Sequence, residues 1–170
     1  MLVNKSLLRR VLPVLAMVSC TTFVQPGRAE YTLFSGVTPK NQLSYSLDFG
    51  KRSISDSYRL VLPGQKMPLG TVQLNILYPE NYNGVFDEKQ ITVSAAGKAI
   101  PIAGVKWQKE KRNLQIDLQD RLQTKGDINI VLGNVHNPDT SGLFYLDCQY
   151  RSSPNFPIAR YAGTWILNIK

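Results

Sequence analysis

Histidine and cysteine are scarce in this chain of 170 residues, and their scarcity excludes several kinds of site. His136 is the only histidine, so neither a metal site of two or three histidines nor a Cys/His zinc cluster can form. Of the two cysteines, Cys20 falls in a segment that we expect to be removed, which leaves Cys148 alone. An exported domain with one cysteine has no internal disulfide, so its core must stabilise it unaided.

Long apolar runs are missing as well, apart from residues 11–24. That run is too short to span a bilayer, which takes about 20 apolar residues. Basic side chains precede it, and small residues follow it at the −3 and −1 positions of a cleavage site: Lys5, Arg9, Arg10, Gly27 and Ala29. This pattern predicts a signal peptide over residues 1–29 that is cleaved before Glu30. An N-terminal anchor that stays uncleaved is the alternative.

A second processing route is open at Cys20. The residues Met17-Val18-Ser19-Cys20 resemble a lipobox, in which the cysteine is lipidated and becomes the new N-terminus. Met17 departs from the usual Leu, whereas Ser19 fits. A lipoprotein anchored at Cys20 is therefore an alternative to cleavage before Glu30.

The basic excess of the chain is partly a property of the predicted signal peptide. Removing residues 1–29 takes away four basic side chains and no acidic one, which lowers the formal net charge from +8 to +4. Such a charge is ordinary for solubility, and we expect no nucleic-acid partner. The remaining residues, 30–170, suit a single domain.

The apolar spacing of a helix is not found after Glu30, where apolar and polar residues alternate instead. This period of two predicts eight or nine short strands, with one polar and one apolar face each. The fold class that we predict is all-β, an antiparallel β-sandwich that is immunoglobulin-like. A short helical turn is expected only within residues 119–125. The strands are expected near 43–49, 58–62, 72–78, 91–95, 105–107, 114–118, 128–132, 144–150 and 165–169.

Catalytic residues are not predicted. His136 would serve as a general base only beside a nucleophile, and no nucleophile elbow or oxyanion loop accompanies it, so we interpret it as a polar turn residue. Cys148 shares its strand face with Phe144 and Leu146, which predicts an inert, buried thiol. We expect no cofactor and no metal.

A turn motif follows the strand near 128–132. Its residues are Asn134, Asn137, Pro138, Asp139 and Gly142. Their side-chain oxygens suggest a calcium loop, but no spaced run of aspartates is present, so a turn that hydrogen-bonds its own backbone is the favoured interpretation.

A basic and aromatic hairpin tip is the candidate partner-binding site. Its residues are Lys106, Trp107, Lys109, Lys111 and Arg112. Aromatic and basic residues together are typical of interfaces, and the cations would attract an anionic surface. A solvated tip that guards against edge pairing is nevertheless the favoured interpretation, and Trp107 could equally pack into the core.

Carboxylates and tyrosines leave two carbohydrate-related alternatives open. A glycoside hydrolase needs two carboxylates, for which Glu80, Asp87, Glu88, Asp117 and Asp120 are candidates by type only. A carbohydrate-binding module would expose rings such as Tyr82, Tyr145 and Tyr161, although tyrosine also packs its ring and leaves its hydroxyl wet.

The C-terminal stretch resembles a cyanobacterial family of exported proteins that is known as a domain of unknown function (DUF2808-like). The motifs that carry the resemblance are Asn137-Pro138, Gly142 with Phe144, Phe156-Pro157 and Tyr161-Ala162-Gly163-Thr164, with looser matches at Pro79-Glu80 and Phe86-Asp87. Ala162 departs from the usual Leu. The resemblance implies export to the periplasm, thylakoid lumen or extracellular space, and it implies no catalytic residue.

These observations favour an exported, non-catalytic β-sandwich protein with a binding or structural role in the cell envelope or lumen. Its expected partner is an envelope or lumen protein, an anionic surface or a glycan, and no transmembrane span is expected after cleavage. A polysaccharide hydrolase or a carbohydrate-binding module is the alternative.

Overall fold

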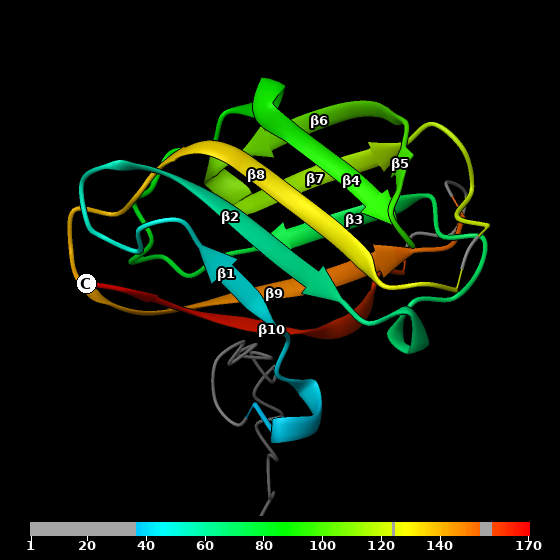
Figure 1. Cartoon of the computed structure of the whole chain (residues 1–170), viewed down its shortest axis with the longest axis horizontal. Helices are drawn as coiled ribbons and strands as arrows, with labels where there is room; N and C mark the ends of the chain where they lie inside the picture. Colours follow the sequence, from blue (N-terminus) through cyan, green and yellow to red (C-terminus); the bar gives the residue numbers. More distant parts are fainter. Residues whose placement is uncertain (1–36, 124, 154–157) are drawn as a thin grey trace, which may run out of the picture. The chain divides into compact units, whose positions relative to one another are not determined.

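The computed structural model describes residues 37–123, 125–153 and 158–170. Within these ranges the chain forms ten strands in two five-stranded sheets that face each other (Figure 1). The predicted signal peptide, Cys20 and the Phe156-Pro157 motif lie outside the described residues. No helix in the described ranges is long and apolar enough to cross a membrane.

Neighbouring strands are antiparallel throughout both sheets. The first sheet has the order β1 (Tyr45–Leu47), β2 (Ser55–Leu62), β8 (Ile128–His136), β4 (Ile91–Ala95) and β5 (Lys98–Ile100). The second has the order β10 (Arg160–Ile169), β9 (Gly142–Arg151), β3 (Gln73–Leu77), β7 (Asn113–Leu118) and β6 (Ile102–Gln108). A 3-10 turn, η1 (Pro39–Asn41), precedes β1, and three more lie between strands: η2 (Gly64–Lys66), η3 (Glu88–Gln90) and η4 (Lys109–Lys111).

The core lies between the sheets, because alternate side chains of each strand point inward. Tyr58 and Leu60 of β2 are fully buried, whereas Arg59 between them is exposed. From the facing sheet, Phe144 and Trp165 are among the largest side chains with no more than 1% of their surface exposed. The predicted antiparallel all-β sandwich is therefore confirmed.

Strand β8 departs from strict alternation by a bulge. Asp56 pairs with Val135 and Tyr58 pairs with Leu132, so two residues of β8 oppose one of β2. Asn134 within this bulge has φ +51°, in the left-handed region that asparagine tolerates better than most residues. The extra residue lets both Leu132 and Val135 point inward, which extends the strand beyond its predicted end.

Three local predictions differ from the structure. Phe49 was expected on an apolar strand face, yet it is 65% exposed, because β1 ends at Leu47 and the chain bends outward. Residues 119–123 form no helical turn. Instead, the backbone carbonyl of Leu122 accepts a hydrogen bond from Gly70 N–H, and the backbone N–H of Leu122 donates to Thr71 O. Strand β5 was not expected, and it follows β4 through a two-residue turn in which Ala96 and Gly97 both have positive φ.

The Tyr161–Thr164 motif holds the N-terminal segment against β10. Gln42 pairs with Thr164, and Leu43 N–H donates to Thr164 O at 2.8 Å. A Cβ on Gly163 would lie 2.7 Å from Asn41 O, so the close approach requires glycine. Because β1 then joins the other sheet, this segment ties both sheets together at one side.

Candidate functional site

The predicted hairpin tip forms, but its basic residues divide between two faces. Turn η4 joins β6 to β7, and Arg112 at its end has φ +50°. Trp107 pairs with the buried Leu114 and therefore faces inward, whereas Lys106 pairs with Gln115 on the outer face of the sheet. Lys106 thus lies on the opposite face of the strand from Trp107.

Trp107 is held at the edge of the core by four contacts. Its indole N–H donates to Tyr78 OH at 2.8 Å, and its ring meets Phe86 edge-on with 5.5 Å between centroids. Its backbone N–H donates to the carboxylate of Glu88, and the Lys109 ammonium lies 4.2 Å from the ring centroid. The indole is half-buried, so one part packs and another part borders the surface.

A hollow of about 610 Å³ opens beside this tryptophan. We call it the Trp107 hollow. Three parts of the chain line it: residues 85–89 with η3, the end of β6 with Lys109, and the facing ends of β2 and β8 with Ser55, Asn134 and His136. The structure therefore brings residues of the predicted tip and of the predicted turn motif into one site.

Asn134 is fixed in the hollow by Asp87. The Asn134 side-chain amide donates to Asp87 Oδ2 at 2.9 Å, and Asp87 Oδ1 accepts from Lys89 N–H at 3.0 Å, which caps η3. The hydrogen bond from Asn134 and then that from Lys89 lower the pKa of Asp87 below its usual value. Asp87 is therefore a carboxylate at neutral pH.

His136 and Cys148 do not meet in the hollow. His136 is exposed and its backbone pairs in both directions with Val85, with N···O distances of 2.9 Å. Cys148 is completely buried between the sheets, and burial raises the pKa of its thiol. A buried thiol of raised pKa is a poor nucleophile, which agrees with its predicted place in the core.

Two members of the turn motif, Asn137 and Pro138, are internal. The Asn137 amide donates to Lys51 O at 2.7 Å and to Asp56 Oδ2 at 2.9 Å, while its carbonyl oxygen accepts from Tyr58 OH. The side-chain amide of Asn137, oxygen included, is therefore already hydrogen-bonded inside the protein. Of the other members, Asp139 is exposed, its N–H donating to Asn83 Oδ1, and Gly142 begins β9.

Asp56 is the main buried polar residue that the sequence reasoning missed. Its carboxylate accepts from the backbone N–H groups of residues 48, 49, 50 and 57 and from Asn137. Burial alone would raise the pKa of Asp56, but these hydrogen bonds lower it overall. The alternation could have indicated its burial, because Asp56 lies two residues before Tyr58 and so falls on the same strand face as the apolar positions 58, 60 and 62.

The tyrosines proposed as exposed rings behave differently from one another. Tyr82 is buried, and its hydroxyl lies 3.1 Å from that of Tyr58. Tyr145 is half-buried, and Tyr161 is 45% exposed with its hydroxyl 2.6 Å from Thr164 Oγ1. These tyrosines thus form no common row of exposed rings.

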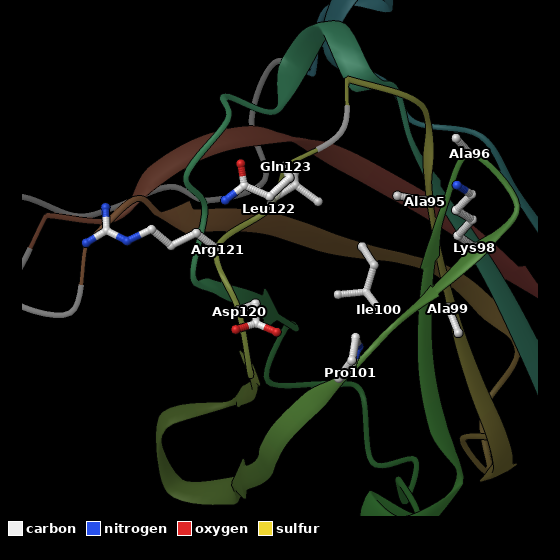
Figure 2. A pocket seen from close by; sticks show the side chains of 10 residues that line it. All are labelled: Ala95, Ala96, Lys98, Ala99, Ile100, Pro101, Asp120, Arg121, Leu122 and Gln123. Carbon is white, nitrogen blue, oxygen red and sulfur yellow. The ribbon is translucent and has the colours of Figure 1, made fainter.

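A second, smaller pocket of about 300 Å³ lies at the opposite ends of β6 and β7. Figure 2 shows Ile100 and Leu122 within it, Asp120 at its rim and the Arg121 side chain extending away from it. The lining of this pocket is mostly apolar. Its charged residues are Lys98, Asp120 and Arg121, which carry charges of both signs. It offers apolar contact but no convergent polar groups that would orient a ligand.

The fold is similar to several solved structures. The bacterial hydrophobin BslA is 12% identical, with a TM-score of 0.48 over 76% of this chain and 91% of that one. The N-terminal domain of the Streptococcus gordonii adhesin Sgo0707 is 8% identical, with a TM-score of 0.48 over 79% of this chain and 34% of that one. An uncharacterised Nocardia farcinica protein, described as immunoglobulin-like, is 7% identical, with a TM-score of 0.45 over 75% and 97%.

These likenesses concern the fold alone. No curated protein matches the chain in sequence. A family model does match, over residues 31–169, which is nearly the whole predicted domain and includes the motifs around Asn137 and Gly163. The chain therefore belongs to the family described as protein of unknown function DUF2808.

Proposed function

We propose that the protein is an exported, non-catalytic binding domain of the cell envelope or lumen, which holds its partner at the Trp107 hollow. Export rests on the sequence alone, namely the basic, apolar and small-residue pattern of residues 1–29. The lipid anchor at Cys20 remains the alternative means of retention.

The observation that carries the binding role is the meeting of the tip and the turn motif in one hollow. Trp107 lies in β6 of one sheet and Lys109 in the turn that follows it, whereas Asn134 and His136 belong to the other sheet, and all four border the same space. A volume of about 610 Å³ is in the range of small-molecule and short-segment sites. Half-buried aromatic rings next to cations are typical of binding surfaces.

The hydrolase alternative finds less support in this geometry. A glycosidase needs a carboxylic acid whose pKa is raised, so that it is protonated when the leaving group departs. In the hollow, hydrogen bonds lower the pKa of Asp87, and Glu88 accepts from the Trp107 backbone. Asp147 has a pKa raised by burial, but it is only 2% exposed and outside the hollow.

Retention on envelope material tests the proposal. The full chain, purified in the form that the cell produces, is incubated with envelope and lumen fractions, and bound protein is quantified. A Lys89→Ala/Lys109→Ala variant is expected to lose about tenfold in retention, because both lysines line the hollow.

The matched control is Lys106→Ala/Lys111→Ala, which removes the same charge from the same part of the chain. Lys106 lies on the outer face, and both lysines are exposed. Retention of the control should equal that of the wild type. Equal losses in both variants, or no retention of the wild type, would contradict the proposed site.

A further inference from the structure

The outer face of the second sheet carries a row of amide side chains. Gln149 of β9, Asn75 of β3 and Gln115 of β7 are paired with one another across neighbouring strands, and their sequence neighbours point into the core. Tyr161 of β10 pairs with Gln149 and extends the row by one strand. We call these four residues the amide row. None of them lines the Trp107 hollow.

The face contains residue types that strands disfavour. Asn75 is the middle residue of β3, and Asp117 lies within β7, although Asn and Asp are depleted from strands. Residues that break a local preference are expected mainly at functional or strained sites. The Asn75 amide donates to Gln73 Oε1 at 3.3 Å, and its oxygen accepts from the Asn113 amide at 3.2 Å. These hydrogen bonds fix the orientation of the centre of the row.

Other polar groups of the row remain open to a ligand. Gln115 Nε2 donates to both carboxylate oxygens of Asp117 at 2.9 Å, so its own carbonyl oxygen is a free acceptor. The Gln149 amide has no hydrogen-bond partner among the described residues, and both groups reach the solvent. The Tyr161 ring is 45% exposed, and its hydroxyl lies 2.6 Å from Thr164 Oγ1. The row therefore offers an aromatic ring followed by amide donors and acceptors.

The spacing and the charge of the face suit an extended, neutral glycan. Neighbouring strands lie about 4.8 Å apart, so the row presents one side chain at each such step across the sheet. A β-1,4-linked pyranose chain advances by nearly the same distance per sugar, and its hydroxyls both donate and accept hydrogen bonds. The charged side chains that border the row are of both signs, namely Lys106, Asp117, Asp147 and Arg151. This face therefore does not select for a ligand with a net charge.

We infer that the amide row binds a neutral β-1,4-linked glycan, whose chain runs across the strands from β10 to β7. One face of a sugar ring covers Tyr161, and hydroxyls of the following sugars bond to the Gln149 amide and to the carbonyl oxygen of Gln115. The row is a second binding surface of the protein, and this inference does not rest on the Trp107 hollow.

Calorimetric titration of the full chain, in the form that the cell produces, tests the inference. The probes are β-1,4-linked oligomers of glucose and of N-acetylglucosamine. Binding of either kind supports the inference, and the tighter of the two identifies the sugar. Affinity should rise with chain length up to about four units, one per strand of the row, and then level off.

An α-1,4-linked glucose oligomer is the matched ligand control. It has hydroxyls of the same kind on a curved chain, and it should bind at least about tenfold more weakly than the β-1,4-linked glucose oligomer of equal length. Equal binding of the two, or no binding of either β-1,4-linked probe, would overturn the inference. Equally tight binding of a Gly/Ser/Asn peptide of similar length would do the same.

Variants locate the binding on the outer face. Gln115→Ala/Gln149→Ala should weaken it by at least about tenfold, and Tyr161→Ala should weaken it as well. Thermal unfolding curves show whether each variant is folded. The matched control is Thr92→Ala/Asn129→Ala, which removes polar side chains from the outer face of the other sheet and should bind as the wild type does. An equal loss in this control would contradict a site at the amide row.

The Lys89→Ala/Lys109→Ala variant separates this surface from the Trp107 hollow. It should bind the oligosaccharides as tightly as the wild type, because neither lysine belongs to the row. A loss of oligosaccharide binding in this variant would place the glycan at the hollow and overturn the inference. If envelope retention depends on the two lysines but no oligosaccharide binds, this inference fails while the proposed function stands.

Discussion

Asp56 is the residue on which the loop between β1 and β2 depends. Four backbone N–H groups and the Asn137 amide donate to its carboxylate, which is 4% exposed. Buried donors are costly to leave without an acceptor, and hydrogen bonds to an ion are the stronger kind. One side chain therefore holds together the bend after Leu47 and the turn motif at Asn137.

Asp56→Ala should lower the free energy of unfolding by at least about 3 kcal/mol, as measured by urea denaturation at neutral pH. The pKa of folded Asp56 is below its ordinary value of 3.8, so the folded protein favours the ionised form. The stabilisation by the charge is therefore fully present above the ordinary value and is lost as the pH falls through the folded pKa.

The matched variant is Asp56→Asn, which keeps the shape and removes the charge. The difference in unfolding free energy between wild type and Asp56→Asn should be large at pH 7 and should shrink as the solution is acidified below pH 3.8. A difference that stays constant over this range would mean that the charge of Asp56 contributes nothing.

Strand β8 is the element that makes the Trp107 hollow. Its bulge turns Val135 into the core and leaves Asn134 and His136 exposed, where they line the hollow. Without the extra residue, a slip of one position would exchange the inner and outer side chains. The site therefore depends on a backbone irregularity as well as on side chains.

Asn134→Val should be less stable than Asn134→Gly by about 1–2 kcal/mol, because φ at this position is +51°. Both variants lose the hydrogen bond to Asp87, so that loss cancels in the comparison. Urea denaturation of the two variants measures the difference directly. Equal stabilities would show that the chain does not hold the left-handed conformation in solution.

The β6–β7 hairpin is the second element of the site, and its residues point to both faces of the sheet. Lys106 and Trp107 are neighbours in sequence and lie on opposite faces of the strand. Arg112 pairs with Glu80 through an exposed contact of 3.2 Å, which adds little stability. Of the five predicted tip residues, Trp107 and Lys109 are the ones that line the hollow beside β8.

The two sheets share one core, and Cys148 lies inside it. Cys148 of β9 is completely buried, and its neighbours on the inner face, Leu146 and Tyr150, also pack in the core. Both sheets contribute side chains to the same cluster. We therefore expect the domain to unfold in one cooperative step.

Cys148 should react with a thiol reagent only when the whole domain unfolds, because burial removes access and raises the pKa of the thiol. A Cys20→Ser background leaves Cys148 as the only thiol in any processed form. The labelling rate, measured against urea, should follow the global unfolding equilibrium. Fast labelling of the folded protein would contradict a closed sandwich.

The amino-acid sequence by itself determined the class of the fold and the burial of Cys148. Period-two alternation is imposed by the pleat of a single strand, so it can be read without knowing which strands are neighbours. It also placed the hairpin tip, because a charged turn between two alternating stretches is a local feature.

Only the tertiary structure decided the composition of the Trp107 hollow. Glu88, Trp107 and Asn134 are far apart in sequence and meet because β4 and β8 are neighbours in one sheet while β6 is the edge of the other. The bulge at Asn134 and the capture of backbone N–H groups by Asp56 likewise depend on strand register. Register and strand order are set by long-range packing, which no local period encodes.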